Sequence, residues 1–108
     1  MFTRIVECTV KPEKKDEFNQ KLRTEVLEIL KKQPGFIDLI GLVSETNPER
    51  ALGISVWNTR EDAERYSREH YTQILDLLKP YLKTTTPKVE TFQVDTWSTH
   101  RIVAGRAA

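Results

Sequence analysis

The stretch that decides the fold runs from Gln33 to Tyr71 and reads QPGFIDLIGLVSETNPERALGISVWNTREDAERYSREHY. Pro34 and Gly35 are typical of a helix end. Residues 36–44 are apolar on both alternating faces, which predicts a strand buried on both sides, with Phe36, Ile40 and Leu42 on one face. Residues 51–57 alternate in the same way after a turn-forming segment at 45–50. The two predicted strands are close enough in sequence to form an antiparallel hairpin.

The flanking segments add two helices and two strands to this hairpin. Residues 2–10 alternate as a strand, and Lys11-Pro12-Glu13 opens a helix whose apolar residues recur on one stripe. Thr59 is a good N-cap for a second helix, which we expect to run toward Leu82, with Pro80 kinking or ending it in its last turn. On this helix His70 falls on the apolar stripe, and residues 88–98 form the last predicted strand.

The resulting order βαββαβ predicts an α+β, ferredoxin-like fold. Right-handed crossovers then give a four-stranded antiparallel sheet with both helices on one face. The other face would be left uncovered although the strand at 36–44 is apolar there. We therefore expect a homodimer that packs through this open sheet face.

Length and composition restrict the other possibilities. With 108 residues the chain is one domain, expected at residues 1–100 with a flexible tail at 101–108. The net charge of +1 and the absence of a basic stripe argue against a nucleic-acid partner. No apolar run approaches the ~18 residues of a membrane span, and the N-terminus lacks signal architecture. The single cysteine, Cys8, excludes an internal disulfide, so a cytoplasmic location is expected.

Several motifs together resemble a known family. They are the Lys11-Pro12-Glu13 helix start, Pro34-Gly35-Phe36, a strand ending at Trp57, an acidic helix start, and a histidine near the middle of that helix. This pattern is similar to the antibiotic biosynthesis monooxygenase domain of the dimeric α/β-barrel group. The resemblance implies a homodimer with a small cavity between sheet and helices in each subunit. Some members oxidise quinol-like aromatic molecules without metal or flavin.

The haem-degrading branch of the same group gives a further comparison. Its Asn, Trp and His positions fall at Cys8, near Tyr66 and near Asp76, and none of the three residue types matches. The resemblance therefore implies an oxygenase acting on a small aromatic or quinol-type molecule, with no cofactor. The alternative is a non-enzymatic homodimeric module that binds a small apolar or aromatic ligand. Haem degradation is the least favoured reading.

His70 and Tyr66 are the candidate catalytic residues. An imidazole can exchange a proton near neutral pH, which suits a base that makes the substrate anion. The competing interpretation of His70 is a half-buried histidine satisfied by a backbone or carboxylate partner. Tyr66 lies one predicted turn earlier, where its hydroxyl could orient a phenolic substrate or its ring could simply pack in the core.

Four further residues are candidate substrate contacts. Trp57 could wall the cavity or pack at the strand–helix corner, and Asn58 after it could serve only the turn. Tyr71 could belong to the cavity, core or interface. Arg4 interrupts the apolar face of the first strand, where it could pair with an anionic substrate or with a carboxylate such as Asp95. No Cys or His spacing suggests a metal site, and there is no glycine-rich phosphate loop.

Overall fold

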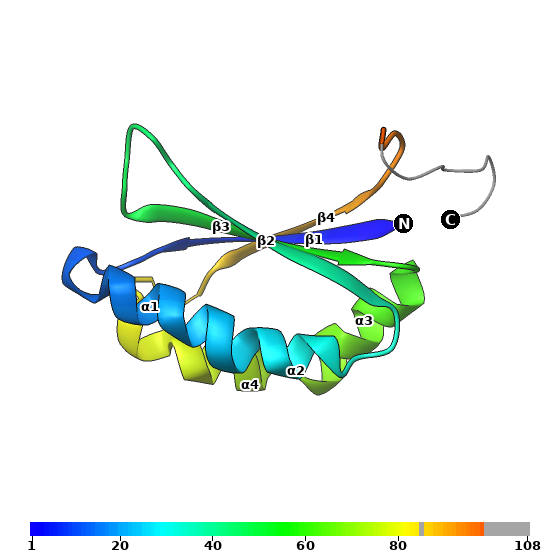
Figure 1. The fold of residues 1–108 in the computed structure, drawn as a ribbon, viewed down its shortest axis with the longest axis horizontal. Coiled ribbons are helices and arrows are strands. Elements are labelled where there is room, and N and C mark those ends of the chain that lie inside the picture. Colours follow the sequence, from blue (N-terminus) through cyan, green and yellow to red (C-terminus); the bar gives the residue numbers. More distant parts are fainter. Residues whose placement is uncertain (85, 99–108) are drawn as a thin grey trace.

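The computed structural model describes residues 1–84 and 86–98; His100 and the expected tail at 101–108 lie outside them. Four antiparallel strands form one sheet in the order β2-β3-β1-β4. All helices lie on one side of this sheet and leave the other side open (Figure 1). The ferredoxin-like α+β prediction is therefore confirmed. The strands are β1 (Phe2–Thr9), β2 (Phe36–Val43), β3 (Arg50–Trp57) and β4 (Lys88–Gln93).

Two strands are shorter than the sequence predicts. β1 ends at Thr9, and Val10 makes an isolated bridge to Leu82. β4 ends at Gln93, although alternation continues in the sequence to residue 98. β1 pairs with β4 as far as the Phe2–Gln93 register pair, and just beyond it the Val94 amide donates to the Met1 carbonyl at 2.9 Å, where the chain of β1 begins.

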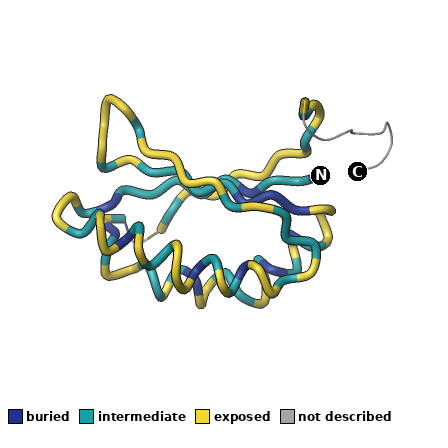
Figure 2. Tube along the Cα trace, viewed as in Figure 1, coloured by how far each residue is buried: buried dark blue, intermediate teal, exposed yellow. Residues whose placement is uncertain are grey.

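The first helical segment is continuous in direction but changes its winding. A short 3-10 turn (Pro12–Lys14) leads into α1 (Lys15–Lys21), a π-helical stretch (Leu22–Val26) and α2 (Leu27–Lys31). Its predicted apolar stripe is confirmed, because Phe18, Val26 and Leu30 are buried. Figure 2 shows buried stretches both in the strands and in the helical layer that covers them.

The second helix is broken, which corrects the expectation of one helix with His70 on its stripe. α3 (Arg60–Glu69) and α4 (Tyr71–Leu78) meet at His70, whose backbone lies at φ −130° and ψ −17°. A 3-10 turn (Lys79–Tyr81) follows and contains Pro80, as the proline predicts. In an unbroken helix, residues five positions apart point about 140° away from each other. The break instead allows Tyr66 and Tyr71 to face the same partner on β1.

The N-terminus of α3 agrees with the sequence. The Asp62 amide donates to Thr59 Oγ1 at 3.1 Å, so Thr59 is the N-cap. Gly35 precedes β2 at φ 78° and lies against this cap. The start of α3 and the residue before β2 are thus held in direct contact.

A β-bulge near Ile37 corrects the predicted faces of β2. Phe36 pairs with Trp57, but Asp38 pairs with the next residue, Val56. The extra residue places Phe36 with Leu39 on the helix side, where both pack against the core. Ile40 and Leu42 therefore point to the open side without Phe36. They are 40% and 46% exposed in the single chain.

Candidate functional site

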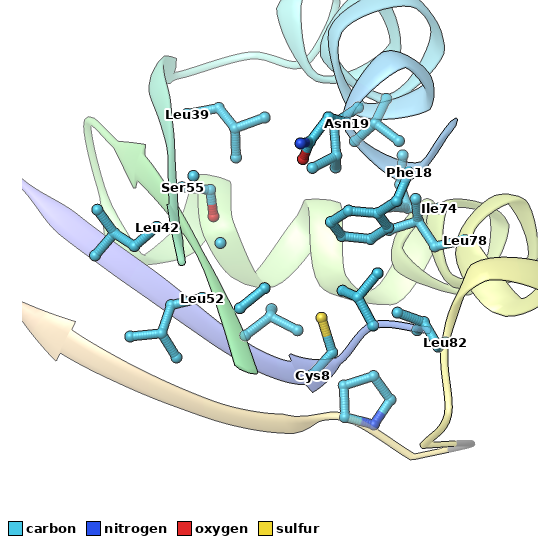
Figure 3. Close-up of a pocket in the computed structure, with 18 of the residues that line it drawn as sticks. Cys8, Phe18, Asn19, Leu39, Leu42, Leu52, Ser55, Ile74, Leu78 and Leu82 are labelled. Atoms are coloured by element: carbon cyan, nitrogen blue, oxygen red, sulfur yellow. The ribbon is translucent and has the colours of Figure 1, made fainter. Parts of the chain in front are cut away.

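A cavity of about 280 Å³ lies between the sheet and the helices (Figure 3). Its floor is the helix-facing side of β1, β2 and β3, and its roof is α1, the π-helical stretch and α4. Gly41 and Gly53 pair directly across β2 and β3, and a Cβ atom added at either would meet nothing within 4 Å. The missing side chains of this glycine pair therefore leave room for a ligand.

The walls of the cavity are mostly apolar. Figure 3 shows Phe18 and Asn19 reaching from the first helical segment and Cys8 rising from β1 toward the same space. Leu42 and Leu52 border the space beside the glycine pair, with side chains directed to the opposite face of the sheet. The exposed lining residues are on the β2 edge and the following turn, which marks where the cavity reaches solvent: Gly41, Leu42, Val43 and Pro48.

Arg4 brings a positive charge into this apolar space. It projects from β1 toward the helices, opposite Ser55 of β3, and is only 5% exposed. Its guanidinium carbon lies 4.6 Å from the centre of the Tyr71 ring and 5.4 Å from that of Tyr66. Each such cation–π contact is worth about 0.5–2 kcal/mol, while removing an ion from water costs several kcal/mol. The two rings thus offset only part of the cost of burying Arg4.

The pKa shifts keep the Tyr66 and Tyr71 hydroxyls and the Cys8 thiol of the cavity in their neutral forms. Burial lowers the pKa of Arg4, and the neighbouring Tyr66 and Tyr71 oppose that shift. Burial raises the pKa of Tyr66 to about 12 and also raises that of Tyr71. Burial raises the pKa of the Cys8 thiol to about 11. At neutral pH the two phenols are therefore hydrogen-bond donors, and the thiol is not a nucleophilic thiolate.

The ion pair considered for Arg4 with Asp95 does not form. The Asp95 side chain is exposed and accepts from Thr96 Oγ1 at 3.5 Å. Within the described residues, none of the ion pairs includes Arg4. Arg4 faces the cavity because its position on β1 has the same parity as Val6 and Cys8, which also line it.

Trp57 lies behind the cavity and does not line it. The side chain is 0% exposed, and its Nε1 donates to Ser55 Oγ at 2.9 Å. Its ring stacks on Tyr66 at 5.0 Å and meets Phe36 edge-on at 5.6 Å. Trp57 therefore supports the ring of Tyr66, which does line the cavity.

His70 and Asn58 also lie outside the lining. The His70 side chain is 33% exposed and has its Nε2 4.0 Å from Glu69 Oε1. Asn58 is exposed, and its amide donates to the Gly35 carbonyl at 2.8 Å, which is a turn role. The helix break accounts for the position of His70, because it places this residue at the junction of α3 and α4 instead of on a buried stripe.

Of the predicted site residues, the structure brings together Arg4, Tyr66 and Tyr71 at the cavity. Sequence reasoning missed Lys15, Asn19 and Ser55, which also line it. A signal existed for two of them. Asn19 sits beside the apolar stripe of the first helix, and Ser55 is a polar residue on the inward-facing alternation of β3.

The structure also shows where the three positions that were compared with the haem-degrading branch lie. Cys8 and Tyr66 line the cavity, whereas Asp76 lies on the surface with its Oδ1 3.3 Å from Lys79 Nζ. No group of three or more His, Cys, Asp or Glu side chains in residues 1–84 and 86–98 could hold a metal ion. Over the same residues, no helix is long and apolar enough to cross a membrane.

Comparison with known proteins gives one family and a set of similar folds. The family model described as antibiotic biosynthesis monooxygenase matches residues 1–77. No curated protein matches the chain. A conserved protein from Methanosarcina mazei Go1 is 24% identical, with a TM-score of 0.71, over 87% of this chain and 92% of that one.

Two further solved structures have names that state an activity. SnoaB of Streptomyces nogalater, a cofactor-independent oxygenase, is 17% identical with a TM-score of 0.73, covering 92% of this chain and 97% of its own. The monooxygenase from the gene ActVA-Orf6 of Streptomyces coelicolor, in complex with nanaomycin D, is 16% identical with a TM-score of 0.73, covering 89% and 88%. At these identities the similarity establishes a shared fold.

Proposed function

Since this chain belongs to the antibiotic biosynthesis monooxygenase family, we propose that it is a monooxygenase that works without a bound cofactor. Its substrate would be a small aromatic or quinol-type molecule held in the cavity between sheet and helices. The observation that carries this proposal is the cavity itself. It is mostly apolar, about 280 Å³ in volume, and its wall carries Arg4 in contact with the rings of Tyr66 and Tyr71.

The chemistry asks little of the protein beyond binding and charge stabilisation. An electron-rich phenol or quinol that loses a proton can pass electrons to dioxygen directly. One oxygen atom then enters the substrate and the other leaves as water, with both reducing electrons taken from the substrate. Arg4 would stabilise the substrate anion, and the neutral Tyr66 and Tyr71 hydroxyls would donate hydrogen bonds that orient it. An apolar cavity strengthens each of these interactions.

Oxygen uptake tests this proposal. We expect the protein to accelerate oxygen consumption by 1,4-naphthohydroquinone or a related quinol above the rate in buffer, with one oxygen atom recovered in the product by ¹⁸O₂ labelling and mass spectrometry. The buffer rate corrects for spontaneous oxidation. If no quinol in a panel of one-ring to three-ring compounds shows faster oxygen consumption or labelled product, the proposed monooxygenase activity is refuted.

His70→Ala is expected to change the oxygen-uptake rate by less than about threefold, because the imidazole lies outside the cavity lining and pairs with surface Glu69. Steady-state rates of wild type and variant at pH 7 measure this. Glu69→Ala is the matched control, since it removes the partner and keeps the imidazole. A loss of more than about tenfold in a folded His70→Ala protein would restore the predicted role of His70 as the base.

One observation favours a second function, ligand binding without turnover. No Asp, Glu or His is found among the described residues that line the cavity, so no side-chain base with a pKa near neutrality faces the ligand. A binding module would show saturable affinity for quinones or quinols with no oxygen uptake. Calorimetry together with the oxygen electrode separates the two functions.

We further propose that the chain works as a homodimer joined through the open face of the sheet. Side chains on this face alternate with those of the cavity floor, and several are apolar and exposed in the single chain. Ile40, Leu42 and Phe92 are 40%, 46% and 45% exposed. They lie on β2 and β4, the two edge strands, so the apolar surface extends across the sheet.

Leu42→Asp is expected to shift the protein from dimer to monomer at about 10 µM, because it would bury an unpaired carboxylate in the interface. Multi-angle light scattering at several concentrations measures the mass. Gln73→Asp places a carboxylate at an exposed position of α4, on the helical side of the sheet and away from the open face, and is the control. A wild-type protein that is already monomeric at this concentration would contradict the dimer.

A further inference from the structure

We propose that the molecule bound in this cavity is a small organic anion, with one or two rings, whose carboxylate or enolate oxygen pairs with Arg4. This inference rests on the proposed function and narrows its substrate class. It concerns the charge of the ligand, which neither the family nor the fold specifies.

The charged residues of the cavity wall all carry positive charge. The lining contains two cationic residues, Arg4 and Lys15, and no acidic residue from any described element. Lys15 lies in the part that includes Pro48, and its Nζ donates to the Pro48 carbonyl at 3.1 Å. Arg4 lies elsewhere on the floor, between the rings of Tyr66 and Tyr71. A ligand in this space therefore meets only positive or neutral side chains.

Arg4 differs from Arg50 and Arg60 in having no carboxylate partner among the described residues. Arg50 contacts Glu7 through two hydrogen bonds of 3.0 and 3.1 Å, and Arg60 donates to Glu64 at 2.9 Å, both on the surface. Arg4 is the only buried charged residue in the described part of the chain. Arg4 is thus a buried charge that no carboxylate in the described residues neutralises, and a bound anion would do so.

The groups around Arg4 suit an anion and not a second cation. Tyr66 and Tyr71 stay protonated because burial raises their pKa values, so they do not act as counter-ions. Their hydroxyls can donate to the oxygen that Arg4 binds. The planar guanidinium matches two oxygens at once, as a carboxylate or a hydroxyketone enolate offers them.

The rest of the cavity limits the size of this anion. About 280 Å³ is at the lower end of small-molecule sites. The walls beyond Arg4 are leucine, valine, phenylalanine and the bare Gly41–Gly53 pair. An anionic head at Arg4 with one or two flat apolar rings against the glycine pair fits both the charge and the space.

Two nearly isosteric probes test the inference by calorimetry at pH 7. They are 2-hydroxy-1,4-naphthoquinone, which is an enolate anion at this pH, and neutral 1,4-naphthoquinone. We expect the anion to bind at least about tenfold more tightly, as a charge-assisted hydrogen bond predicts. In Arg4→Met the difference should fall to less than about twofold, with affinity for the neutral probe retained. Arg4→Lys should keep part of the preference.

Each outcome decides a separate claim. Equal affinities in the wild type, or an anion preference that survives Arg4→Met, would overturn the anionic ligand. The wild-type comparison decides alone if Arg4→Met does not fold. Tighter binding of the anion with no oxygen uptake from any quinol would refute the proposed monooxygenase activity and would still support the anion site at Arg4. Oxygen uptake with neutral quinols that is unchanged in Arg4→Lys and Arg4→Met would refute the anion site at Arg4 and leave the proposed monooxygenase activity supported.

Discussion

Gly35→Ala is expected to lower the free energy of unfolding by about 3 kcal/mol or more. At φ 78° a residue with a Cβ pays about 1–2 kcal/mol for the left-handed conformation alone. The added Cβ would also clash with Asp62 Oδ2 and lie 2.7 Å from Asp62 Cβ. Asp62 cannot yield cheaply, because its amide is capped by Thr59 and its carboxylate accepts from Thr59 Oγ1 at 2.9 Å. The substitution therefore strains the turn and disturbs the start of α3.

Thermal and urea unfolding measure this effect. For a domain of this size we expect the Tm to fall by roughly 12–24 °C. Gly53→Ala is the matched control, because the same methyl group at that position meets nothing within 4 Å; its stability should be equal to that of the wild type or slightly higher. A Gly35→Ala protein within about 3 °C of the wild type would show that the close approach to Asp62 relaxes freely.

Gly53→Leu is expected to reduce turnover, or ligand affinity if the protein only binds, by at least about a hundredfold. The position faces the cavity across from Gly41, so the isobutyl group would occupy the space beside the substrate. A displacement of the substrate by 1 Å from its reactive position already costs about that factor. Stability should not suffer, since an apolar group would fill an empty apolar space.

The readout is kcat/KM for the quinol together with the affinity for 1,4-naphthoquinone. Gly53→Ala again serves as control and should keep most of both, because one methyl group leaves most of the cavity open. Circular dichroism checks that Gly53→Leu is folded. Unchanged kinetics in a folded Gly53→Leu protein would place the reaction outside this cavity.

Local sequence signals were sufficient for the elements near Gly35. A glycine after Pro34 predicted a helix end, and the structure shows the positive φ there. Thr59 predicted a cap, and its hydroxyl accepts from the Asp62 amide. These predictions succeed because a cap or a turn depends on residues within one helical turn of each other.

Two predictions failed where the pattern was interrupted. Strict alternation predicts Phe36 on the same face of β2 as Ile40, and the bulge near Ile37 places it on the helix side. Helical periodicity predicts His70 on an apolar stripe, and the break between α3 and α4 removes it from that stripe. Periodicity extrapolates one regular geometry, so a single irregular residue reassigns every position on one side of it.

The sequence by itself determined the order of the elements, the ferredoxin-like fold and an apolar open face on the sheet, because alternation, caps and turns are properties of neighbouring residues. Only the tertiary structure decided which side chains surround the cavity. Arg4 meets Tyr66 and Tyr71 through the register of β1 and the angle of the helix break. More than sixty positions separate Arg4 from the two tyrosines in the chain, so no local pattern could report that a buried charge and two phenols face the same space.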